Sequence, residues 1–120
     1  MKLTVDSITK VLEVHYELMT MLSKITDLDK RSFCSKYLHF HLPDLFFIYD
    51  SRARTALRDF TNRMPKELRH IPQLQTVDKE YATFFCKCFD LKNRIDNEHK
   101  TILTTRQLDN LLIDTANNKL

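Results

Sequence analysis

Cysteine and histidine, the side chains that most readily hold metals or carry protons, occur in this chain in the spacings C-x-C and H-x-H. Cys86 and Cys88 form the first pair, and His39 and His41 form the second. Residues two apart on a helix diverge by about 200°, so neither pair can grip one metal ion without help. Cys34 makes the cysteine count odd. We therefore expect no metal and no cofactor, with all three thiols reduced as in the cytoplasm.

The histidines have structural interpretations that we prefer to functional ones. His15 falls in the middle of an apolar helix face, where a histidine is typically a core residue with a hydrogen-bond partner. A catalytic or ligand-binding role is the alternative for His15. His41 falls beside an aromatic stripe, whereas His39 faces elsewhere, near Lys36.

Asp50 is the one weak candidate for a catalytic carboxylate. It follows an apolar run and precedes Ser51 and Arg52, a position that first suggests a helix cap. A catalytic carboxylate needs a nucleophile, a general acid or a metal nearby, and the sequence proposes none. We therefore expect a cap, and the chain as a whole favours a non-enzymatic protein.

Positive charge is concentrated in one segment. Residues 51–70 carry six basic groups against two acidic ones, net +4, in a chain whose net charge is +3. The six basic residues are Arg52, Arg54, Arg58, Arg63, Lys66 and Arg69. They form a candidate phosphate-contacting patch for nucleic acid, or a solvated surface, or partners for acidic groups of the first helix.

The composition predicts an all-α fold without a sheet. The 120 residues contain no glycine, whereas about eight are expected at the usual frequency. Hairpin turns and phosphate-cradling loops are hard to build without it. Apolar periodicity predicts a single domain, residues 1–120, with about five helices. Their ranges are 7–26, 30–41, 51–63, 76–97 and 105–116.

The faces of these helices follow from the same periodicity. In the helix at 30–41 one stripe is aromatic: Phe33, Tyr37, Phe40 and His41. Leu38 points away from it, so we expect this helix to be covered on two sides. In the helix at 51–63 the inner face is Ala53, Ala56, Leu57, Phe60 and Met64, and in the helix at 76–97 Cys86 lies on the far side.

The segments between the helices are also interpretable. Residues 44–49 are densely apolar and have no strand partner, so we predict a buried extended connector. Residues 64–75 contain two prolines and read as a loop with one short turn. Asp29 is expected to cap the second helix, and Thr104 with Gln107 matches a capping box at the last.

No apolar run approaches the length of about 20 residues that spans a bilayer. The N-terminal residues lack the apolar stretch and cleavage site of a signal peptide. We therefore expect a cytoplasmic protein without a membrane partner.

The segment from Ser35 to Arg52, S-K-Y-L-H-F-H-L-P-D-L-F-F-I-Y-D-S-R, resembles one in small uncharacterised bacterial proteins. Those proteins read S-K-x-L-H-F, then proline, then F-x-I-Y/W-D-S, and they travel on mobile gene cassettes. The chain thus resembles an integron cassette protein. The resemblance covers about 18 residues; it implies a helical fold and supplies no activity.

A more distant similarity connects the same segment to helix-hairpin-helix DNA glycosylases. They also run from a helix through a proline-containing connector to an aspartate that opens another helix. That aspartate is catalytic in the family and corresponds to Asp50. The family's glycine-rich hairpin should precede Arg31, where this chain has Leu28-Asp29-Lys30, and the chain is much shorter. The similarity therefore implies a local geometry at Asp50 and not the reaction.

The preferred function is association, with a second copy as a homodimer or with a protein partner. The chain has 12 aromatic residues, and several, such as Phe89, lie off the main helix stripes. One small domain is not expected to bury them all, which favours an interface. The alternative is a nucleic-acid-binding domain that uses residues 52–69 in a reduced glycosylase-like helical fold.

Overall fold

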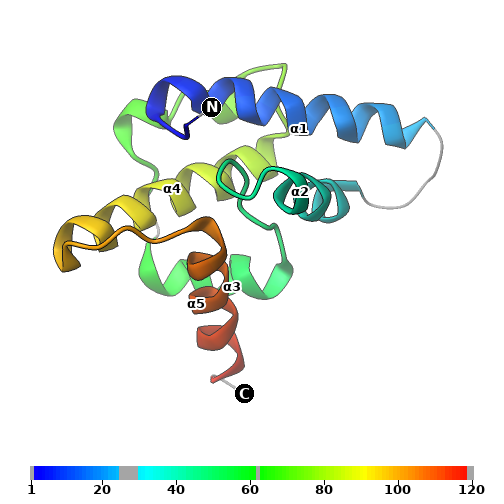
Figure 1. Cartoon of the computed structure of the whole chain (residues 1–120). Helices are drawn as coiled ribbons and strands as arrows, with labels where there is room; N and C mark the ends of the chain where they lie inside the picture. Colours follow the sequence, from blue (N-terminus) through cyan, green and yellow to red (C-terminus); the bar gives the residue numbers. More distant parts are fainter. Residues whose placement is uncertain (1, 25–29, 62, 119–120) are drawn as a thin grey trace.

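The computed structural model describes residues 2–24, 30–61 and 63–118. The described residues form five α-helices and three short 3₁₀ helices, without a strand (Figure 1). The α-helices are α1 (Ile8–Ser23), α2 (Lys30–His41), α3 (Ser51–Phe60), α4 (Lys79–His99) and α5 (Thr105–Asn117). The 3₁₀ helices are η1 (Val5–Ser7), η2 (Lys66–Leu68) and η3 (Ile71–Gln73). The predicted all-α class is confirmed.

Three predicted helix boundaries need correction. α3 ends at Phe60 and not at residue 63, because Thr61 is already extended, with φ −159° and ψ 135°. α4 begins at Lys79 and not at residue 76, because the Asp78 carboxylate accepts a hydrogen bond from the Tyr81 N–H (2.9 Å). α1 ends at Ser23, and the rest of its predicted range lies outside the described residues, as does the predicted Asp29 cap.

Local capping signals set the other helix starts. In α5 the Thr104 hydroxyl accepts from the Gln107 N–H (3.1 Å), and the Gln107 side-chain oxygen accepts from the Thr104 N–H (2.9 Å). This is the predicted capping box. Between α3 and α4 the loop holds two 3₁₀ turns where one was expected, and buried Leu68 and Ile71 anchor them.

Helix α4 forms the centre of the fold. Figure 1 shows it crossing the middle of the molecule, with α1 above it and α3 below, and α5 packs against α3. Its buried side chains cover more than half of the helix circumference: Tyr81, Ala82, Phe84, Phe85, Cys86, Cys88, Phe89 and Leu91. Cys86, which was predicted on the far side from the main stripe, is fully buried. Phe89, which lies off that stripe, is buried as well, since α4 contacts α1, α3, α5 and η3.

Helix α2 buries the side that carries Leu38. Its buried side chains are Lys30, Cys34, Ser35, Leu38 and His39. The aromatic stripe faces outward, with Phe33 55%, Tyr37 48% and Phe40 81% exposed. The expectation that α2 is covered on two sides is thus wrong for this chain by itself.

The orientation of α2 is linked to the connector that the sequence predicted at residues 44–49. Its residues Leu45, Phe46, Phe47 and Tyr49 are buried, as predicted, yet it has no sheet partner among the described residues. Buried backbone N–H and C=O groups need hydrogen-bond partners.

Helix α2 and Tyr81 of α4 supply those partners. The Ser35 hydroxyl accepts from the Tyr49 N–H (2.8 Å), and His39 Nδ1 lies 2.8 Å from the Phe46 carbonyl oxygen. The Tyr81 hydroxyl donates to the Phe47 carbonyl (2.6 Å). Ser35 and His39 of α2 therefore face the interior, where they contact the connector, and the aromatic residues of α2 face solvent.

Helix α3 lies against α5 through small residues. Ala53 and Ala56 are fully buried, as the sequence predicted, and Leu108 and Leu112 are the buried leucines of α5. Phe60, which was placed on the same inner face, is 36% exposed because it occupies the last turn of α3. Across the described ranges, no helix has both the length and the apolar character that crossing a bilayer requires.

Candidate functional site

The exposed aromatic side chains of α2 form one continuous surface, which we call the aromatic face: Phe33, Tyr37, Phe40 and His41. The rings of Phe33 and Tyr37 stack at 6.3 Å and 20°. His41 lies 4.5 Å from the Tyr37 ring and 5.3 Å from the Phe40 ring, centroid to centroid. Leu42, 45% exposed, continues this surface beyond the helix.

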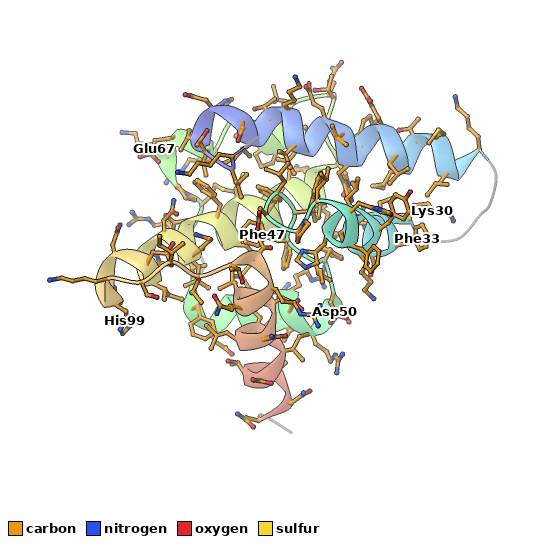
Figure 2. The ribbon with its side chains drawn as sticks, in the orientation of Figure 1. Lys30, Phe33, Phe47, Asp50, Glu67 and His99 are labelled. Atoms are coloured by element: carbon orange, nitrogen blue, oxygen red, sulfur yellow. The ribbon has the colours of Figure 1, made fainter. Side chains whose placement is uncertain are left out.

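The aromatic face is comparable in area to the largest apolar patch of a typical monomer. From the exposed fractions, its three phenyl-bearing side chains leave roughly 300–450 Å² accessible to solvent. The largest apolar patch on a typical monomer is about 300–600 Å², and such patches are frequently functional. Figure 2 shows Phe33 at the periphery on α2, whereas Phe47 of the connector lies in the middle of the molecule.

The two histidines of the H-x-H pair are separated by this arrangement. His41 belongs to the aromatic face, beside the stripe where the sequence placed it. His39 is only 7% exposed and holds the connector through the Phe46 carbonyl. This contact supports the structural interpretation of His39. The rings of His39 and His41 do not converge on one site.

His15 is enclosed in the core. Its Nε2 lies 3.2 Å from the Arg31 carbonyl oxygen, and its ring stacks on Tyr81 at 3.9 Å and 21°. Nδ1 is buried and has no hydrogen-bond partner among the described residues. Burial lowers the pKa of His15 to about 4, so the ring is neutral near pH 7. With Nε2 as the donor to Arg31, His15 is a structural residue, as expected.

A network of charges centred on Arg31 joins α2, α3 and the start of α4. Arg31 donates through Nε and Nη2 to the two carboxylate oxygens of Asp78, at 2.6 and 3.1 Å. Its Nη1 lies 2.6 Å from Glu80 Oε2, and its Cζ lies 5.8 Å from the centre of the Tyr49 ring. On the other side of Glu80, Arg54 Nη1 lies 3.5 Å from Oε1.

The titration of these groups follows from their partners. Burial opposes ionisation of Asp78, but the hydrogen bonds from Arg31 and Tyr81 outweigh it and hold the pKa of the carboxyl below its usual value. Burial, together with the hydrogen bond to Glu80, raises the pKa of the Tyr49 phenol. Asp78 is therefore ionised near neutral pH, and Arg31 compensates its charge.

Next to this network lies a cleft between α3 and α4, with a volume of about 470 Å³. We call it the α3–α4 cleft. Its lining residues are Arg31, Arg54, Leu57, Arg58, Thr61, Asp78, Lys79, Glu80, Thr83, Phe84 and Lys87. Five of these side chains are basic and two are acidic, so the cleft carries a net +3.

The basic segment is divided by the fold. Of its six predicted contact residues only Arg54 and Arg58 line the cleft. Arg52 pairs with Asp50 at 3.6 Å, and Arg69 donates through Nε to the Met64 carbonyl at 3.3 Å. The other basic residues of the cleft come from α2 and α4. Sequence reasoning missed Arg31, Lys79 and Lys87, because the sequence contains no signal that they meet.

Asp50 is a helix cap. Its Oδ1 accepts a hydrogen bond from the Arg52 N–H at 2.8 Å, as the sequence predicted, and Figure 2 shows it at the start of α3. It does not line the cleft. No group of three potential metal ligands among His, Cys, Asp and Glu occurs in the portion of the chain that is described.

All three cysteines are buried: Cys34, Cys86 and Cys88. Burial raises the pKa of the Cys86 thiol to about 12, and it raises the pKa of Cys88 well above the usual value. Both groups are thiols near neutral pH, and a thiol is a poor nucleophile and metal ligand compared with a thiolate.

Comparisons of the chain with family models, with curated proteins and with solved structures found no significant match. The resemblance of residues 35–52 to cassette proteins and glycosylases therefore stays a prediction, and the function has to be argued from the geometry.

Proposed function

We propose that this chain is a non-enzymatic interaction protein that forms a homodimer through the aromatic face of α2. The observation that carries this proposal is the outward stripe of Phe33, Tyr37 and Phe40, of which Phe40 is 81% exposed. Leaving this area in water costs free energy that an interface recovers, at about 25 cal/mol per Å².

A second copy suits this face better than a partner of different chemistry. A two-fold dimer places the same patch on both sides, so the patch must be complementary to itself. Aromatic rings meet this condition, because edge-to-face and offset pairs form between identical side chains.

The area is also consistent with a dimer. A standard interface buries about 800 Å² on each partner, and its centre is apolar while its rim is polar. The roughly 300–450 Å² of the aromatic face supplies such a centre. Leu42 and the polar side chains at the edges of α2 would form the rim.

The candidates for catalysis give no support to an enzyme. The Asp50 carboxylate caps α3, where it accepts a hydrogen bond from the Arg52 N–H. His15 is buried in the core, and Cys86 and Cys88 are buried and protonated. A reaction centre needs a nucleophile, base or acid that can touch substrate, and these side chains cannot.

Sedimentation equilibrium at micromolar concentration tests the proposal. The wild type should sediment as a dimer, and the double variant Phe33→Ser, Phe40→Ser should weaken dimerisation by at least about 30-fold, the effect of an interface hot spot. Both positions are exposed in the single copy, so circular dichroism should show an unchanged fold.

The matched control is Ile102→Ser, which removes a side chain 83% exposed in the connection between α4 and α5. It should leave the dimer intact. A strict monomer for the wild type contradicts the proposal. So does a dimer that survives the double variant.

The nucleic-acid alternative requires the basic residues of 52–69 to act as one surface. Arg54 and Arg58 support it, since both contribute to the positive α3–α4 cleft. Arg52 and Arg69 point instead to local partners. We therefore prefer the dimer, and the experiments on the cleft below include nucleic acid as an outcome.

A further inference from the structure

The α3–α4 cleft holds more positive charge than its own residues compensate. The two acidic side chains, Asp78 and Glu80, are already paired with Arg31 and Arg54. The remaining basic side chains of the lining are Arg58, Lys79 and Lys87, and none has an ion pair among residues 2–24, 30–61 and 63–118. Three cations that face one space repel one another, and an anion placed between them relieves that repulsion.

Arg54 brings a partly exposed guanidinium to the same cleft, since 41% of its side chain is accessible to solvent. Its Nη1 lies 3.5 Å from Glu80 Oε1 and donates to the Tyr49 hydroxyl at 3.3 Å. A guanidinium has five N–H donors, so further donors remain for an anion bound in the cleft.

The cleft has an apolar side as well. Leu57 and Phe84 are both 3% exposed and lie in its wall, while Thr61 and Thr83 provide hydroxyl groups. Its volume of about 470 Å³ lies within the range of about 300–1,000 Å³ typical of small-molecule pockets. Cations beside an apolar wall suit a ligand with one charged end and one apolar body.

We propose that the α3–α4 cleft is a binding site for a small organic phosphate monoester. Its dianionic phosphate is held by Arg54, Arg58 and Lys87, and its apolar body lies against Leu57 and Phe84. The planar guanidinium groups can donate pairs of hydrogen bonds to phosphate oxygens, which a carboxylate ligand with one charge would use less fully. This site is separate from the aromatic face, so the proposal does not depend on the dimer.

A small ligand fits the observations better than a nucleic-acid strand. A strand needs cations spaced along a track, and the basic residues outside the cleft are dispersed: Arg52 and Arg69 have local partners. Arg58, Lys79 and Lys87, by contrast, line one cleft together with Arg31 and Arg54. That arrangement matches a single phosphate and not a series of them.

The experiment titrates ¹⁵N-labelled protein with phenyl phosphate and follows the backbone amides by NMR. Inorganic phosphate, phenol and a twelve-residue oligothymidylate are titrated in parallel. Phenyl phosphate should bind more tightly than either inorganic phosphate or phenol, and the largest shifts should fall in residues 54–58 and 83–87. This part of the experiment uses only the wild type, so its result does not depend on whether a variant folds.

Three variants then locate the charge. Arg58→Gln and Lys87→Gln should each weaken phenyl phosphate binding at least about tenfold, since each removes a charged contact. Arg63→Gln is the matched control, because it removes the same charge from an exposed residue of the same segment that does not line the cleft. It should change the affinity less than about twofold.

Three results would overturn the proposal. Phenyl phosphate could fail to bind saturably, or it could bind no more tightly than inorganic phosphate. The third is that Arg63→Gln weakens phenyl phosphate binding as much as Arg58→Gln and Lys87→Gln do. Binding of the oligothymidylate at the same amides with much higher affinity than phenyl phosphate, and with a steep salt dependence, would assign the cleft to nucleic acid instead.

Discussion

His15 should make the stability of this protein depend on pH between neutrality and about pH 4. Burial lowers its pKa from 6.5 to about 4 in the folded chain, while the unfolded chain keeps the ordinary value. Between those two values the unfolded state binds more protons, so the free energy of unfolding falls as the pH falls. The contribution of His15 is fully present above pH 6.5 and is lost as the pH approaches 4.

The magnitude follows from the shift. A change of one pKa unit corresponds to about 1.4 kcal/mol, so the full effect is about 3 kcal/mol. Most of it, about 2–3 kcal/mol, should be lost between pH 7 and pH 4.5. This is a large share of the stability of a small domain, which is typically about 5–15 kcal/mol.

Urea unfolding at several pH values isolates the effect when the wild type is compared with His15→Gln. Glutamine can still donate to the Arg31 carbonyl that Nε2 of His15 approaches at 3.2 Å, but it does not titrate. Carboxylates that do not interact with His15, such as Asp109, titrate alike in both proteins and cancel in the difference. The wild type should lose about 2–3 kcal/mol more than the variant between pH 7 and pH 4.5.

Two results would refute this reasoning. Unfolding free energies that fall in parallel for both proteins would show that His15 does not titrate differently in the folded and unfolded states. An NMR titration of the His15 ring that gave an ordinary value in the folded protein would show the same directly.

Other contacts give further predictions. Replacing Asp50 with alanine should cost about 0.5–2 kcal/mol in urea unfolding, because α3 loses its cap; asparagine or serine should restore most of it, and equal losses for all three would contradict the cap. Arg31→Met should destabilise the fold by about 1–3 kcal/mol, because the partly buried Asp78 loses the two hydrogen bonds that Arg31 donates. Unchanged stability would show that the Arg31 network does not stabilise the fold. The cysteines should react with a thiol reagent only as fast as the protein opens, since Cys86 and Cys88 are buried and protonated. Elemental analysis should find no bound metal, and stoichiometric zinc would contradict this expectation.

The sequence determined those features that depend on neighbours along the chain. The absence of glycine and the apolar periodicity indicated an all-α fold, and α2 has the predicted bounds, residues 30–41. Asp50 and Thr104 were identified as caps, and both accept the expected backbone N–H groups. Such hydrogen bonds join residues two or three apart, so the sequence contains both partners.

The tertiary structure decided which face of a helix is inside. Periodicity placed Phe33, Tyr37 and Phe40 on one stripe of α2 and Leu38 away from it, and it did not say which side faces inward. In the fold the buried side carries Ser35 and His39, which both contact the backbone of the connector. Those partners are 14 and 7 residues away along the chain, so the periodicity within α2 does not contain them.

The candidate sites depend on the fold in the same way. Arg31 and Asp78 are 47 residues apart, and no periodicity or spacing in the sequence connects them. The α3–α4 cleft unites Arg58 with Lys79 and Lys87, although only the first lies in the basic segment. No pattern in the sequence shows which charged side chains come together in the fold. Only the packing of α3 on α4 brings these cations into one space, because proximity across helices is set by the core beneath them.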